Sequence, residues 1–211
     1  MRVEQAVANP CGIAVLGTSI CRVPPDHAII RCTVERTDHA PGAAFEQARV
    51  AAASVRGAFE RLGVAEVKTS RISLSQDRRW DPDQKQQIDV GYTARLSFQA
   101  AVQDLDTLET VLVDIIEAGA NRLDGVAFET SMLGELRAQA RRQAVENGRS
   151  KAEHYARAAG VALGRLLHLE DTDPKGLRGR EEVTRGGASD AVDPGWIEVG
   201  ASVHLTFKLE R

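Results

Sequence analysis

Residues 88–102 read IDVGYTARLSFQAAV, with an apolar or small side chain at every second position. Successive side chains of a β-strand point to opposite faces of a sheet, so this alternation predicts a strand with one buried face. The last apolar stretch, residues 197–209 (IEVGASVHLTFKL), alternates in the same way. Long strands with one buried face are typical of antiparallel sheets. The chain is therefore predicted to be built on antiparallel β-structure.

The rest of the chain follows strand or helix periodicity in turn. Runs of β-branched and small residues predict further strands, at 12–23, 27–36, 67–75, 123–130 and 161–170. Apolar residues three and four positions apart predict helices, at 43–62, between Asp104 and Gly119, and at 132–159. The order ββαββαβαββ indicates an α+β fold, a largely antiparallel sheet with helices packed on one face.

Two of the predicted helices carry patterns that indicate how they pack. The helix at 43–62 has an apolar stripe at helical spacing, formed by Phe45, Ala48, Ala52, Val55, Phe59 and Leu62. The stripe of the helix at 132–159 is made of small residues in its middle, Ala140, Ala144, Gly148 and Ala152. Small residues let a helix axis lie close to a sheet or to a partner helix. Gly63, Gly119 and Gly160 are placed to end the three helices.

Three polar segments are predicted to be irregular. Pro24, Pro25 and Asp26 indicate a turn between the first two strands, because each proline fixes φ and removes a hydrogen-bond donor. Residues 77–87 (DRRWDPDQKQQ) suit an exposed hairpin loop. Residues 171–194 hold too little apolar surface to offset the entropy of ordering and are predicted to be a flexible loop.

Domain organisation follows from these segments. Residues 1–11 are predicted to be an N-terminal extension, and residues 12–211 a single domain, because no obvious linker separates two cores. A loose internal duplication, with each half built on a strand–helix–strand unit, is the alternative.

Five short motifs, in order and at regular spacing, carry a resemblance to a known family. They are IAVLG (13–17) followed by PDHA (25–28), GYTA (91–94) with VQDLD (102–106), EAGAN (117–121), KAE (151–153) with AAGVALG (158–164), and PG (194–195). The chain resembles the SIMPL domain family over most of its length. The resemblance implies an exported bacterial protein, ring assembly in some members, a link to stress tolerance, and an adaptor role in an animal member. The chain departs from the pattern in lacking the second glycine after Gly17.

Composition and charge exclude several classes of function. The net charge of −3 disfavours binding to nucleic acid or to an acidic membrane, both of which favour a basic surface. No apolar run reaches the length of a membrane helix, so membrane insertion is not predicted. The apolar run from Ile13 to Leu16 is too short for a signal peptide, so a cytoplasmic location is predicted, against the family norm.

Cysteine usage predicts free thiols. The chain has three cysteines, an odd number without metal-ligand spacing, and a reducing cytoplasm keeps such thiols free. Cys32 shares a predicted strand face with three apolar residues and is interpreted as a small buried hydrophobe: Ala28, Ile30 and Val34.

Catalytic, cofactor-binding and metal-binding residues are not predicted. The five histidines, at 27, 39, 154, 168 and 204, lack ligand spacing, although His168 and His204 could share a site if their strands are neighbours. Asp38 beside His39 resembles part of a catalytic triad, but adjacent loop residues rarely present both groups to one nucleophile. The arginines of the helix at 132–159 are interpreted as a solvated face rather than a polyanion site.

Trp80 marks the predicted interface. It stands in a polar segment directly after Arg78 and Arg79, and an exposed tryptophan flanked by arginine is a common anchor of protein contacts. These three residues are the candidate site for a partner or for another subunit.

Function is predicted as a non-enzymatic, self-assembling scaffold or adaptor linked to stress response. Long strand edges offer surfaces for self-association, so a homo-oligomer is expected. The resemblance implies that this oligomer is a ring. A protein partner of unknown identity is expected as well. The alternative is a small-molecule-binding protein or enzyme with a pocket between sheet and helices or between subunits. A third reading is docking of a partner by the loop at 171–194.

Overall fold

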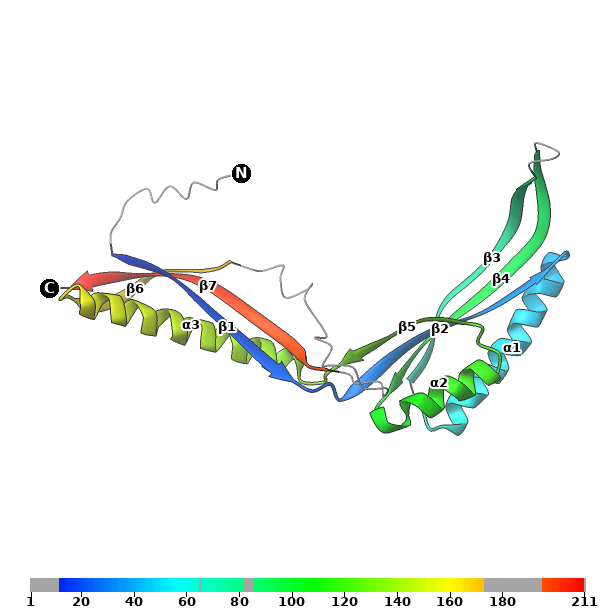
Figure 1. Ribbon diagram of the computed structural model, residues 1–211, viewed down its shortest axis with the longest axis horizontal. Helices are drawn as coiled ribbons and strands as arrows, with labels where there is room; N and C mark the ends of the chain where they lie inside the picture. Colours follow the sequence, from blue (N-terminus) through cyan, green and yellow to red (C-terminus); the bar gives the residue numbers. More distant parts are fainter. Residues whose placement is uncertain (1–11, 65, 82–85, 173–194, 211) are drawn as a thin grey trace. The chain divides into compact units, whose positions relative to one another are not determined.

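The computed structural model describes residues 12–64, 66–81, 86–172 and 195–210 (Figure 1). The chain divides into two compact units, here called the α1 unit (residues 25–129) and the α3 unit (residues 1–24 with 130–211). Each unit is described by itself. The predicted extension at 1–11 and all but the start of the predicted loop at 171–194 lie outside the described residues. The single domain over residues 12–211 stays a prediction.

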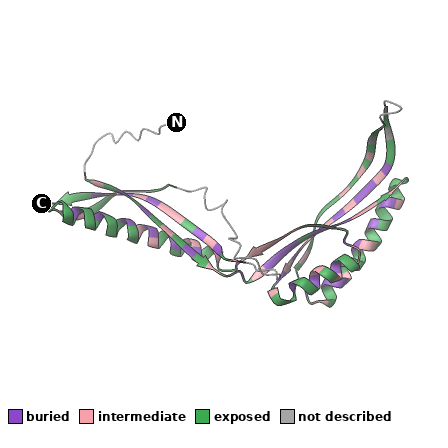
Figure 2. Cartoon of the chain, viewed as in Figure 1, coloured by how far each residue is buried: buried purple, intermediate pink, exposed green. Residues whose placement is uncertain are grey.

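The α1 unit is a four-stranded antiparallel sheet in the order β3-β4-β2-β5. Its strands are β2 (His27–Asp38), β3 (Glu66–Asp81), β4 (Gln86–Val102) and β5 (Arg122–Glu129). Its helices are α1 (Pro41–Arg61) and α2 (Leu108–Glu117), the latter preceded by the 3-10 turn η1 (Leu105–Thr107). Both helices pack on one face of the sheet, and their buried residues form one core cluster with those of the strands. Figure 2 marks the buried residues along these helices and strands in purple.

The α3 unit is a three-stranded antiparallel sheet in the order β1-β7-β6. Its elements are β1 (Ile13–Val23), β6 (Ala162–Asp171), β7 (Ile197–Glu210) and the helix α3 (Leu133–Ala158). As the alternation of β7 predicts, Val203, Leu205 and Phe207 are buried against α3, but Leu209 at the end of the strand is 37% exposed. The predicted α+β class, the antiparallel strands and the element order ββαββαβαββ are confirmed.

The strands form two sheets where one sheet was predicted. The turn at Pro24-Pro25 was expected to join β1 and β2 as neighbours, yet β1 pairs with β7, and β2 pairs with β4 and β5. Neither proline has an N–H to donate to a ladder, so the two residues separate the strands instead of turning one against the other.

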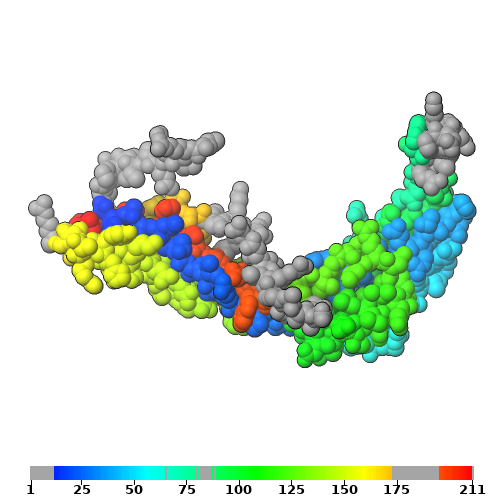
Figure 3. Space-filling view, viewed as in Figure 1, coloured from blue at the N-terminus to red at the C-terminus, as the bar shows by residue number. Residues whose placement is uncertain are grey.

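Helix α3 lies directly against β1, as its small-residue stripe predicts (Figure 3). A Cβ atom on Gly17 would lie 2.1 Å from the carbonyl oxygen of Ala144, and the backbone of Gly148 is its other near neighbour. The same helix covers the outer edge of β1, because Asn147 Nδ2 donates to the carbonyl oxygen of Thr18 (3.0 Å) and Lys151 Nζ to that of Leu16 (2.7 Å). Small side chains on both elements make this close contact possible.

The buried stripe of α1 differs from the predicted one at its start. Phe59 is fully buried, but Phe45 is 39% exposed, and Ala44 takes the inward position in the first turn. Gly63 ends the helix as predicted, with φ at 72° and a hydrogen bond from Val64 N to the carbonyl oxygen of Phe59.

Candidate functional site

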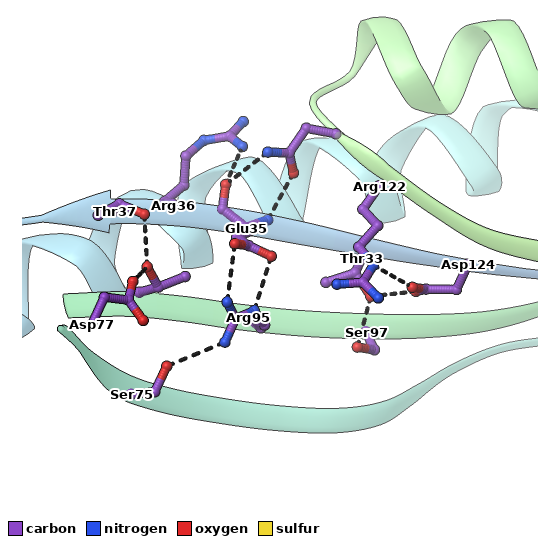
Figure 4. A network of polar contacts seen from close by, with 12 residues as sticks. Thr33, Glu35, Arg36, Thr37, Ser75, Asp77, Arg95, Ser97, Arg122 and Asp124 are labelled. Carbon is purple, nitrogen blue, oxygen red and sulfur yellow. Dashed lines mark hydrogen bonds and ion pairs between the residues drawn. The ribbon is translucent and has the colours of Figure 1, made fainter. Parts of the chain in front are cut away.

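The face of the α1-unit sheet that α1 and α2 do not cover carries a dense set of polar side chains. Alternation places the apolar residues of β2 and β4 under the helices and their polar neighbours on the other face. We call this uncovered surface the polar face. Three rows of polar contacts run across its strands (Figure 4).

The first two rows join β3, β4 and β2. In the first row, Thr93 donates to Asp77, and Thr37 and Thr93 share a hydrogen bond of 2.7 Å. In the second row, the guanidinium of Arg95 donates to both carboxylate oxygens of Glu35, with Nε–Oε2 at 2.9 Å and Nη2–Oε1 at 3.1 Å. Arg95 Nη1 also donates to Ser75 Oγ at 3.2 Å. The hydrogen bond to Glu35 is the main reason why the pKa of Arg95 is raised above its ordinary value.

The third row extends to β5. The hydroxyl of Thr33 donates to Asp124 Oδ2 at 2.6 Å and shares a 2.8 Å hydrogen bond with Ser97. Arg122 Nε pairs with Asp124 Oδ1 at 2.7 Å. Thr33 and Thr93 are both buried although no helix lies over them. The rows therefore form a polar layer whose side chains are bonded to one another across the strands.

The sequence pattern did not reveal these rows, because it predicted only which face of the strands is buried and not how the outward residues pair. A signal was present in the threonine, serine and charged residues at alternate positions of both strands. Polar side chains directly opposite each other on antiparallel strands interact, but the register that sets Glu35 against Arg95 and Thr33 against Ser97 is a property of the fold.

The predicted interface residues lie at the end of β3. The segment at 77–87 was predicted to be an exposed hairpin loop, and β3 and β4 do pair as consecutive antiparallel strands. The predicted extent of the loop is wrong, because β3 continues to Asp81 and β4 begins at Gln86. Register with β4 places Arg78 opposite Asp89, and their side chains form an ion pair of 3.1 Å. Trp80 is 58% exposed, and the side chain of Arg79 lies outside the described residues. Their role as an interface stays a prediction.

The other candidate residues are not part of the polar face. His168 on β6 faces Glu170 at 3.7 Å, and His204 on β7 is the backbone partner of Glu170. Asp38 accepts a hydrogen bond from the backbone N–H of Ala40, which is the main cause of its lowered pKa, so it orders the start of α1. Among the described residues, no group of three or more His, Cys, Asp or Glu is placed to hold a metal ion.

Comparison with known proteins places this architecture in a family. A family model described as "SIMPL: Protein of unknown function (DUF541)" matches residues 13–207. The chain belongs to the SIMPL family. The 26 kDa periplasmic immunogenic protein of Brucella melitensis is 26% identical over 80% of this chain and 69% of its own length. The protein YggE of Edwardsiella ictaluri is 26% identical over 81% of this chain and 74% of its own length.

A solved structure with weak similarity is "The crystal structure of AtUAH in complex with glyoxylate". It is 14% identical, with a TM-score of 0.24, over 64% of this chain and 33% of that chain. The Brucella melitensis protein and its counterpart from Brucella abortus are both named as periplasmic proteins, which points to export, so the predicted cytoplasmic location is wrong. None of the helices in the described part of the chain has the length and hydropathy of a membrane-spanning helix.

Two of the SIMPL motifs mark close contacts in the fold. The glycine of IAVLG is Gly17, which the backbone of α3 approaches. The asparagine of EAGAN is Asn121, whose side-chain amide accepts from the backbone N–H of Glu35 (2.8 Å) and donates to the carbonyl oxygen of Glu35 (3.0 Å). The Asn121 side chain thus bonds to the backbone of β2 as a neighbouring strand would, directly before β5 begins. These motif residues hold the fold together.

Cys32 gives the α1 unit an alkaline limit of stability. Its thiol is buried on the helix-covered face of β2, as predicted, and burial, with a smaller contribution from the charge of Asp124, raises its pKa from 9.0 to about 11. The thiol ionises near pH 9 in the unfolded chain but only near pH 11 in the folded chain. The contribution of this thiol to the free energy of unfolding is therefore complete below pH 9. It is lost as the pH rises toward 11, by about 1.4 kcal/mol per pH unit.

Urea unfolding of the wild type and of Cys32→Ala between pH 8 and 11 measures this contribution. The free energy of unfolding of the wild type should fall more steeply with pH than that of the variant, whose other titrating groups are the same. Parallel pH profiles would contradict the assignment to Cys32.

Proposed function

We propose that this SIMPL-family chain is a non-enzymatic, self-assembling scaffold or adaptor of the bacterial envelope that acts in the response to stress. The observation that supports the proposal is that strands at the edges of both sheets carry exposed apolar side chains. Ile72 and Leu74 on β3, Trp80 at its end, and Leu166 and Leu169 on β6 are all exposed on edge strands. Edge strands of this kind are templates for pairing with another chain.

The polar face supports the same proposal. Its ion pairs and hydroxyl bonds are formed within the chain, and each carboxylate in the three rows is already held by a donor. Such a preordered layer can meet a polypeptide without first being ordered, which lowers the cost of binding. The envelope location rests on the names of the Brucella relatives, and the stress role rests on the family resemblance.

Sedimentation velocity across a wide range of protein concentration tests the assembly. The expected result is a homo-oligomer that dissociates on dilution, at neutral pH and moderate salt. A chain that sediments as a monomer at every concentration would rule out self-assembly. A strain lacking the gene, compared under envelope stress with one that carries it, tests the stress role separately.

A further inference from the structure

β3 is the least protected strand edge of the described residues. Helix α3 covers the middle of the outer edge of β1, where Asn147 donates to the carbonyl oxygen of Thr18 and Lys151 to that of Leu16. The pairing of β6 with β7 is interrupted by two register shifts, and β5 is short and contains one. Bulges of this kind protect an edge from further pairing. In β3 the register with β4 is unbroken from Arg71 to Asp77, between two shifts.

The side chains of this regular stretch are apolar on one face and polar on the other. Ile72 is 59% exposed and Leu74 47% exposed, although their direct partners on β4, Leu96 and Ala94, are buried. The reason is that α1 packs mainly over β2 and β4 and reaches β3 mainly through Arg56, which donates to Thr69 Oγ1 at 2.8 Å. Ile72 and Leu74 therefore form an apolar strip at the open side of α1.

Phe45 extends the strip from the helix. It lies three helical turns before Arg56 on α1, which places both side chains on the same side of the helix, toward β3. Its exposure, unexpected from the apolar stripe of the sequence, is explained if the open side of α1 is completed by another surface. Large apolar side chains that gather at an unpaired edge mark an interaction site.

We propose that the β3 edges of two copies of this chain pair antiparallel about a two-fold axis at Leu74. The charges of the stretch select this partner and direction. Antiparallel pairing places Arg71 opposite the partner's Asp77 at both ends, whereas parallel pairing in register would set like charges side by side. The described residues contain no ion pair of Arg71, and Asp77 uses only Oδ2 in its bond from Thr93.

The resulting dimer would continue the sheet across both copies. A two-fold axis perpendicular to the sheet keeps both α1 helices on one face, so the strips of Ile72, Leu74 and Phe45 meet between them. Isologous pairing of this kind makes a closed dimer. The inference rests on the proposed self-assembly and names the surface through which the copies would associate. Arg78 and Trp80 follow the paired stretch on the same strand.

Disulfide trapping tests the register. Directly opposed residues of an antiparallel pair have Cα atoms about 4.5–5.5 Å apart, within the range of a disulfide. In a Cys11→Ser background, Leu74→Cys should form a covalent dimer under mild oxidation, and the double variant Ile72→Cys/Gln76→Cys should do the same. Val50→Cys is the matched control, because Val50 is 55% exposed on the outward side of α1. Equal cross-linking at positions 50 and 74 would overturn the proposal.

Charge reversal provides the second test. Arg71→Asp should weaken dimerisation at least tenfold in sedimentation equilibrium, and adding Asp77→Arg should restore it. An oligomer that tolerates both Arg71→Asp and Leu74→Lys would refute the β3 interface while leaving self-assembly intact. A wild-type monomer would refute both. A monomer that captures an extended peptide at β3 would also overturn the two-fold pairing.

Discussion

Replacing Gly17 with valine is expected to unfold the α3 unit or to leave it severely destabilised. The added Cβ would lie 2.1 Å from the carbonyl oxygen of Ala144 and 2.9 Å from the backbone nitrogen of Gly148. Both contacts are with helix backbone, which cannot move aside as the end of a side chain can. Overpacking of a core usually costs 1–3 kcal/mol, and a backbone clash of this size should cost about 3 kcal/mol or more.

Gly200→Val is the matched control for this substitution. Gly200 lies on β7 of the same sheet, and the nearest atom to an added Cβ is the carbonyl oxygen of Ser19 at 3.6 Å, an ordinary contact. Hydrogen exchange of α3 and β7, together with urea unfolding, measures the effect. Loss of protection in Gly17→Val but not in Gly200→Val is the expected result. Equal stability of the two variants would show that α3 does not lie against β1 as described.

The same contact can be tested from the helix side, with a control substitution that should have the opposite effect on stability. Gly148→Ala adds a Cβ 2.6 Å from Leu205 Cδ1 and 3.1 Å from Gly17 Cα, so it should destabilise the unit despite the better helix propensity of alanine. Gly57→Ala, in the middle of α1 with only the tip of Arg61 within 4 Å, should stabilise its own unit by up to about 1 kcal/mol.

This contact was largely predictable from the sequence, since short-range patterns carried it. The stripe of Ala and Gly in the helix at 132–159 indicated a close approach, and the alternation of residues 88–102 and 197–209 placed both long strands. Periodicity reports which face of an element is buried, because burial acts on each element separately. It therefore gave the fold class and the element order.

Strand partners were not predictable in the same way. Nothing within β1 distinguishes pairing with β2 from pairing with β7, which lies at the other end of the chain. The same limit hid the polar face, because Thr33, Glu35 and Arg95 acquire their meaning only from the register of β2 with β4. The end of β3 was missed because the polar segment at 77–87 lacks the alternation that marks a strand with one buried face.

Phe59→Ala is expected to be the most destabilising single substitution in the α1 unit. Phe59 is the largest fully buried side chain on α1, within the cluster that joins the helix to β2 and β4. Truncation of a buried phenylalanine to alanine leaves a cavity and costs about 3–5 kcal/mol. Because a small unit has a stability of about 5–15 kcal/mol, this loss is a large fraction of the total.

Phe45→Ala tests whether the loss of stability depends on the burial of the phenylalanine and not on the residue type alone. The two phenylalanines lie on the same helix and belong to the same apolar stripe of the sequence, but Phe45 is partly exposed at the open side of α1. Its truncation should cost about 1 kcal/mol or less in urea unfolding of dilute protein. At high concentration it should weaken self-association, which Phe59→Ala affects only through loss of the fold. Equal costs for the two substitutions in dilute solution would mean that Phe45 is a core residue and that the open side of α1 is covered within a single chain.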